Sequence, residues 1–202
     1  MMSNNNMKVL RFFIVTILPF MLFACSYTQN TENVEKFLNY SSLAEVNKQG
    51  NYTASLYKQS QFNGTAVAVG QFCSAHKYPY DFDGLFDEAV SSVLDKVYET
   101  VELEMASDEM LSRKDVSIDV KPFEILLMCH PVTEYYWECV ATTRLSALVV
   151  KADDTKINIK VEARKASSAG GVCGGGAVAV SSAIGQTISD FSGQLHNFLI
   201  TD

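Results

Sequence analysis

The sequence predicts an α+β domain, a two-layer sandwich with two helices packed on one face of a mixed, mostly antiparallel sheet of four to five strands. Two segments, 84–101 and 178–200, carry apolar residues at every third or fourth position, which is typical of a helix with one buried side. Between them, three runs alternate apolar and polar residues, as antiparallel strands with one buried face do.

The first half of the expected domain begins at the turn signal Asn63-Gly64, followed by a strand over 65–72 and a loop over 78–83. The helix over 84–101 comes next, with Asp83 as its expected N-cap. A short alternating run over 101–105 then predicts a strand. The buried face of this helix is expected to comprise Phe86, Val90, Val93, Val97 and Val101.

The second half is predicted to be a meander followed by a helix. Its strands cover 116–128, 135–149 and 157–163, and Pro122 indicates a bulge or an edge in the first of them. The helix over 178–200 is expected to bury one apolar stripe, formed by Ile184, Ile188, Phe191, Leu195 and Phe198.

Composition favours one folded domain and argues against several functions. The chain has 202 residues, of which 48% are hydrophobic and 19% charged, so it contains enough apolar residues for a core. Its 23 acidic and 16 basic residues give a net charge of −7, which argues against a dedicated nucleic-acid-binding protein. Its 3 histidines are far apart, which argues against most histidine-based catalysis and two-histidine metal sites.

The first 24 residues resemble a secretory signal peptide. Lys8 and Arg11 are their only charged residues, and an apolar run covers 12–24. A helix of that length spans about 20 Å, which is short of the roughly 30 Å of a bilayer core. A basic start followed by a short apolar segment therefore predicts a signal peptide over 1–24.

The end of this leader, Leu22-Phe23-Ala24-Cys25-Ser26, resembles the bacterial lipobox. The resemblance implies that Cys25 receives a diacylglycerol thioether, that cleavage follows Ala24, and that the new amine is acylated, typically with palmitate. Ser26 resembles the signal for release to the outer membrane. The alternative is an ordinary signal peptide that ends near an unmodified cysteine. We expect residues 25–62 to form a lipidated polar tether and residues 63–202 the single domain.

Four cysteines follow Cys25, and an even number in an exported chain suggests disulfides. We favour Cys129–Cys139, because both residues lie on strands joined by a short connection, and then Cys73–Cys173. A zinc site is the alternative, because His76 and His130 lie beside two of these cysteines. The chain has no CxxC pair, so we expect no metal.

No catalytic motif is complete. Ser55-Leu-Tyr-Lys58 and Ser74-Ala-His-Lys77 match Ser-x-x-Lys, but the Ser-Asp-Asn and Lys-Thr-Gly motifs of penicillin-binding enzymes do not occur. The glycine-rich segment 167–176 lacks the Lys-Ser/Thr of a nucleotide loop. We therefore expect neither an enzyme nor a bound cofactor.

The order of these features is similar to that of a group of small envelope lipoproteins with a TolB-N-terminal-like fold. The shared features are a lipobox, a polar tether, a strand, loop and helix over 65–101, a meander and a final helix. The group includes auxiliary lipoproteins of lipid-transport systems, YajG-type lipoproteins and peptidoglycan-synthase activators. The resemblance implies the fold and an accessory role, and Cys25 is the one functional residue it identifies.

These features predict a non-enzymatic binding protein on the periplasmic face of the outer membrane, held by lipid on Cys25. It would bind an envelope protein and assist envelope transport or assembly. An activator of a cell-wall synthase is the first alternative, and a periplasmic hydrolase or a lipid-carrying module are others. Tyr78, Tyr80 and Phe82 are the candidate partner-binding residues, because the loop expected over 78–83 would expose them.

Overall fold

The computed structural model describes residues 27–28, 43, 46–105, 114–133, 136–168 and 173–201. The predicted signal peptide and Cys25 lie outside these residues. Within the described residues, no helix has both the length and the apolar character needed to cross a membrane. The elements are β1 (Tyr27–Thr28), β2 (Gln49–Lys58), β3 (Asn63–Val67), β4 (His76–Asp81), α2 (Asp83–Val97), β5 (Tyr98–Met105), β6 (Val116–Val120), β7 (Glu124–Thr133), β8 (Tyr136–Lys151), β9 (Lys156–Ser167) and α3 (Gly175–Ile200).

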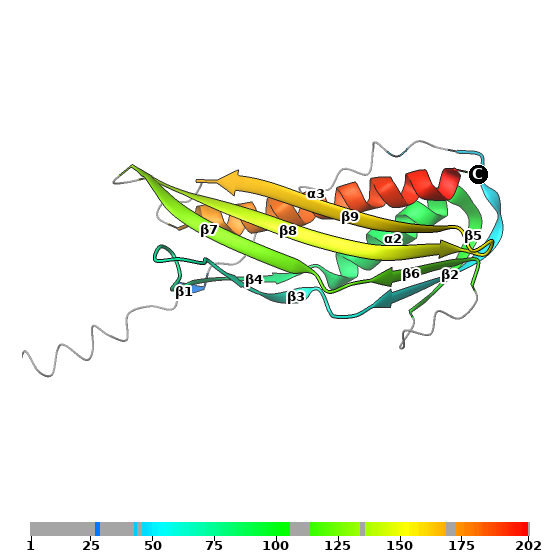
Figure 1. The fold of residues 1–202 in the computed structure, drawn as a ribbon, viewed down its shortest axis with the longest axis horizontal. Helices are drawn as coiled ribbons and strands as arrows, with labels where there is room; N and C mark the ends of the chain where they lie inside the picture. The colour runs from blue at the N-terminus through cyan, green and yellow to red at the C-terminus, as the bar shows by residue number, and fades with distance from the viewer. Residues whose placement is uncertain are drawn as a thin grey trace, which may run out of the picture.

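The structure confirms the α+β prediction, because a mixed sheet packs against the two helices α2 and α3 (Figure 1). The larger sheet has the order β5-β2-β6-β8-β7, and β9 pairs with the other side of β8. β6 and β7 pair with successive halves of the long strand β8. The two strands are thus one interrupted strand, and Pro122 lies at the predicted interruption.

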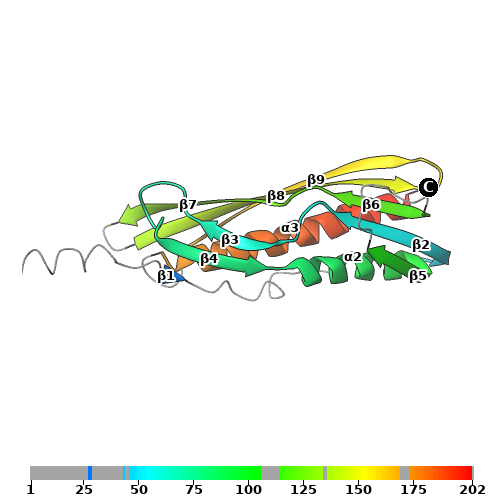
Figure 2. The same cartoon turned by 90° about the horizontal axis from the view of Figure 1, so that it is seen from below.

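A smaller sheet, with the order β1-β4-β3, continues the larger one (Figure 2). Ala68 forms a parallel bridge with Leu127 of β7, and the Val69 N–H donates to the Leu127 carbonyl at 2.8 Å. The two sheets therefore meet along β7, and the molecule is elongated (Figure 2).

Two sequence predictions are wrong at the start of the domain. β2 lies within the predicted tether 25–62, yet Leu56 is 1% exposed and β2 pairs with both β5 and β6. The domain therefore begins before the predicted boundary at residue 63. The segment 78–83, predicted to be a loop, is mostly strand β4, which pairs with β3.

The helix α2 also differs from its prediction at both ends. Asp83 does not cap it, since the N-cap residue is Phe82 and no side chain bonds to the cap. The Asp83 carboxylate instead accepts the Phe62 N–H at 3.0 Å and forms an ion pair with Lys58 at 2.9 Å. The helix ends at Val97 rather than 101, because the next residue is already in the extended conformation of β5.

The core lies between the sheet and the two helices. α3 packs against β8 and β9, and α2 packs against α3 and β5. Phe86 of α2 joins the two helices, because its ring centroid lies 5.2 Å from that of Phe191 in α3. The buried Thr143 and Thr187 hydroxyls form a hydrogen bond at 2.6 Å where β8 meets α3, and Thr143 also donates to the Ala183 carbonyl at 3.2 Å.

Two glycines of α3 predict opposite responses to alanine. A Cβ at Gly176 would overlap the Tyr78 ring, whereas a Cβ at Gly193 meets nothing within 4 Å. We expect Gly176→Ala to lower the free energy of unfolding by about 1–3 kcal/mol through overpacking. The control Gly193→Ala should raise it by roughly 0.8–1 kcal/mol through helix propensity. Urea denaturation measures both, and a Gly176→Ala variant as stable as the wild type would contradict this packing.

Candidate functional site

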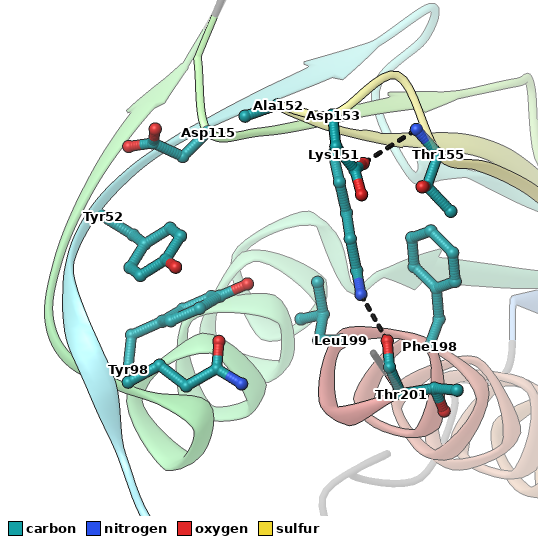
Figure 3. Close-up of a pocket in the computed structure, with 11 residues that line it drawn as sticks. Tyr52, Tyr98, Asp115, Lys151, Ala152, Asp153, Thr155, Phe198, Leu199 and Thr201 are labelled. Atoms are coloured by element: carbon teal, nitrogen blue, oxygen red, sulfur yellow. Dashed lines mark hydrogen bonds between the residues drawn. The ribbon is translucent and has the colours of Figure 1, made fainter.

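A cleft of about 520 Å³ opens at the end of the molecule where α3 finishes (Figure 3). One wall comes from β2 and β5, and the other from the β8–β9 turn and the last turn of α3. The volume lies within the range of small-ligand sites. We call this end of the molecule the cleft pole. The residues that line the cleft are Gln49, Tyr52, Tyr98, Asp115, Lys151, Ala152, Asp153, Thr155, Phe198, Leu199 and Thr201.

Two stacked tyrosines form the first wall of the cleft. The ring centroids of Tyr52 and Tyr98 are 4.1 Å apart, and the ring planes differ by 24°. Parallel pairing of β2 with β5 places Gln49 opposite Tyr98, which brings the two aromatic side chains to one end of the sheet. Burial raises the pKa of Tyr98 from 10.0 to about 12, which keeps its hydroxyl protonated well into the alkaline range.

The second wall carries the amine of Lys151. Its Nζ donates to the Thr201 carbonyl at 2.6 Å and lies 4.9 Å from the centroid of the Phe198 ring. Such a cation–π contact adds to the hydrogen bond in holding the amine at the last turn of α3. Lys151 therefore places a fixed positive charge beside an aromatic face, as Figure 3 shows.

Asp115 and Asp153 supply the carboxylates of the cleft. The Asp115 Oδ2 accepts the Thr53 N–H at 2.8 Å and the Thr53 hydroxyl at 3.0 Å, which fixes its orientation. In the β8–β9 turn, the Thr155 N–H donates to Asp153 at 2.9 Å and lowers the pKa of that carboxyl group. Hydrogen bonds therefore hold both carboxylates in a fixed orientation at the cleft.

The cleft lining combines aromatic and charged side chains. The described lining contains no histidine, cysteine or serine. It does offer two aromatic faces, an amine and two carboxylates. Such a lining suits an amphipathic ligand with an aromatic or apolar body and charged ends.

The Ser-x-x-Lys match at Ser55 and Lys58 has a structural explanation. Both residues lie on β2, not on a helix, so the lysine is not one helical turn from the serine. The Ser55 hydroxyl donates to the hydroxyl of Ser117 at 3.1 Å. The Lys58 Nζ forms ion pairs with Asp83 and Asp87, at 2.9 and 2.7 Å.

The predicted partner-binding residues do not form an exposed surface. Tyr78 is 0% and Phe82 is 2% exposed, and Tyr80 is partly buried. The Tyr78 hydroxyl donates to the Cys173 carbonyl at 2.7 Å, inside the core. The prediction that this segment is exposed is wrong because β4 pairs with β3 and turns these rings towards the helices.

The four cysteines form the two disulfides favoured by the sequence analysis. Cys129 and Cys139 face each other directly across β7 and β8, with Cα atoms 4.0 Å apart. Cys73 and Cys173 join the β3–β4 connection to the start of α3, with Cα atoms 5.6 Å apart. The sulfur atoms of Cys73, Cys129 and Cys139 lie within 4.8 Å of one another, so the two bonds pack side by side.

Sequence reasoning did not identify the cleft. Its lining comes from five separate stretches of the chain, and no short motif links them. The nearest sequence signal is the polar and aromatic character of β2, in a segment that resembled a tether.

A scan against protein-family models found no match, and a search of curated proteins found none. A search of solved structures found distant likenesses. A Xanthomonas campestris protein of family DUF330 is 10% identical, with a TM-score of 0.44, over 85% of this chain and 94% of its own. A hypothetical protein from Chlamydia trachomatis is 8% identical, with a TM-score of 0.44, over 77% and 100%. Rare lipoprotein B from Shewanella oneidensis is 10% identical, with a TM-score of 0.34, over 73% and 90%.

The two disulfides should contribute unequally to stability. Cys73–Cys173 closes a loop of 100 residues and Cys129–Cys139 a loop of 10. From loop entropy, replacing both cysteines by serine should cost about 4.7 kcal/mol for the first pair and less than about 3 kcal/mol for the second. Urea denaturation of the two double variants measures the difference. An equal loss of stability in the two double variants, or a larger loss for the Cys129–Cys139 pair, would contradict the entropic argument.

The buried tyrosines predict a loss of stability at alkaline pH. The folded protein raises the pKa of both Tyr78 and Tyr98 from 10.0 to about 12, so folding favours their protonated forms. Their contribution to the free energy of unfolding is complete below pH 10. It decreases as the pH rises towards 12, because between these values the two tyrosines ionise in the unfolded chain but not in the folded protein. Denaturant unfolding between pH 9 and about 11.5 should show this decrease. Tyr98→Phe should have a smaller decrease, and an identical pH dependence would contradict the assignment.

Proposed function

We propose that this protein is a non-enzymatic, lipid-anchored binding protein of the bacterial envelope. It stands on the periplasmic face of the outer membrane and assists envelope transport or assembly by binding a partner. One observation carries the proposal: β1 lies at one end of the molecule, and the elements that line the cleft, β2, β5 and the last turn of α3, meet at the other end (Figure 1). An anchor at one end leaves a binding site free at the other.

The position of β1 supports the anchor. The strand begins at Tyr27, two residues after Cys25, and pairs with β4 at His76 and Lys77. Two residues of extended chain span at most about 7 Å. A lipid on Cys25 would therefore be attached close to β1. We call this end the β1 pole; it also holds the β3–β4 connection over 68–75 and the β7–β8 hairpin over 127–141.

The chemistry of the cleft supports binding. Tyr52, backed by the buried Tyr98, and Phe198 offer apolar faces, while Lys151 and Asp115 offer charges of opposite sign. A segment of an envelope protein with an aromatic residue and flanking charges matches this set. The hydrogen bonds of Lys151 and Asp115 hold both groups in place before binding, which reduces the entropic cost of association.

Replacing the proposed lipid-bearing thiol tests the anchor. Cys25→Ser should yield a protein that carries no acyl chains and is either unprocessed or released from the membrane. Intact mass and cell fractionation measure these outcomes, and Ser26→Ala is the matched control that keeps the thiol. A Cys25→Ser protein with the wild-type mature size and full membrane retention would contradict the proposal.

Site-specific crosslinking in intact cells tests partner binding at the cleft. A photoreactive phenylalanine analogue at Gln49, inside the cleft, should give a discrete adduct with an envelope protein. The same analogue at the exposed Lys160, on the sheet face without helices, is the control and should not give that adduct. Tyr52→Ala should weaken the Gln49 adduct by removing one aromatic face. No adduct from Gln49, or the same adduct from both positions, would count against the cleft.

A further inference from the structure

The exposed apolar side chains of this protein gather at one end. Seven large hydrophobic residues are exposed among the described residues, and six of them lie on β3, on β7 or in the β3–β4 connection. The seventh, Met105, ends β5, away from the β1 pole. The six are Val67, Val69, Phe72, Leu126, Met128 and Val132, which we call the apolar patch.

The patch lies mainly on the face of the sheet that the helices leave open. Ala68 and Leu127 form the bridge between the two sheets, and both are buried, at 3% and 1% exposure. Neighbours of a buried strand residue point to the opposite face. Val67, Val69, Leu126 and Met128 therefore lie together on the helix-free face, and Val69 is 60% and Met128 54% exposed.

The proposed anchor would lie beside the apolar patch. Lys77 of β4 pairs with Thr28 of β1 on one side and with Val67 on the other. One strand thus separates the patch from the chain that follows Cys25. A lipid on Cys25 would bring the bilayer surface to the end of the molecule where the apolar side chains are exposed.

The charges at this end are few. In the described part of the β1 pole, the carboxylates, lysines and arginines amount to Lys77, Glu138 and Lys165. The Glu138 carboxylate lies 3.4 Å from His130. An apolar surface with few charges and a slight excess of lysine suits the interface of a phospholipid membrane.

We propose that the apolar patch enters the interfacial region of the phospholipid bilayer that holds the anchor. The inference rests on the proposed lipid anchor and adds a second contact, made by the folded domain itself. The patch then fixes the domain on the membrane in one orientation, with the cleft pole directed away. A single flexible attachment would leave the orientation of the domain free.

The single tryptophan of the chain reports on this contact. Trp137 lies at the β1 pole, and its ring centroid is 4.6 Å from that of Phe72 in the patch. The processed full-length protein is reconstituted into vesicles of phosphatidylcholine brominated on its acyl chains. Immersion in the interface should quench about half of the tryptophan emission relative to unbrominated vesicles. Flotation of the vesicles separately measures how much protein they hold.

Substitutions within and outside the patch separate the domain contact from the anchor. The exposed positions Val69 and Met128 are changed together to Asp, and the matched control is Met105→Asp, which is 52% exposed away from the patch. The double variant should float with the vesicles but lose most of the quenching, whereas the control should keep both. Circular dichroism checks that each variant is folded.

The outcomes distinguish the two proposals. Wild-type protein that carries acyl chains and floats, but shows no quenching, would overturn the membrane contact and leave the anchor intact. Quenching that is unchanged in the Val69 and Met128 double variant would also overturn it. Protein that has no acyl chains and does not float would instead refute the anchor.

Discussion

The structure depends on the burial of α3. This helix has 26 residues, and Asp190 is its one charged residue. Sixteen of its residues are buried, and a helix that is buried around most of its circumference needs cover on several sides. β8 and β9 cover one side and α2 another, so the sheet and the second helix are both required. Close approach at the helix start depends on Gly175 and Gly176, because a side chain there would overlap Ser167 or the Tyr78 ring.

The length of α3 also sets the distance between the two ends of the molecule. A helix of 26 residues is about 39 Å long. Its first turn lies beside the disulfides, and its last turn forms part of the cleft through Phe198 and Thr201. The same element thus supports both ends: the proposed membrane contact at the β1 pole and the proposed binding site at the other.

The long periodic elements were predictable from the sequence, and the short ones were not. The helix α3 and the strands β8 and β9 repeat one period over many residues, so their patterns are unambiguous. β2 buries three consecutive residues, Ala54, Ser55 and Leu56, and shows no alternation. β4 is short and contains Pro79, which argues against a strand. Aromatic residues such as Tyr78 and Phe82 occur both in cores and at interfaces, so the sequence alone could not place them. The cleft could not be predicted because its lining comes from segments far apart in the chain.

The disulfide between Cys129 and Cys139 has a consequence for the whole surface of the hairpin. The two residues are directly opposite in the β7–β8 ladder. A slip of one position would exchange the two faces of β7, moving Leu126 and Met128 inward and Leu127 outward. The covalent bond forbids that slip. Oxidation therefore determines which side chains this hairpin shows to its surroundings, and a reduced chain would have to rely on packing alone to make the same choice.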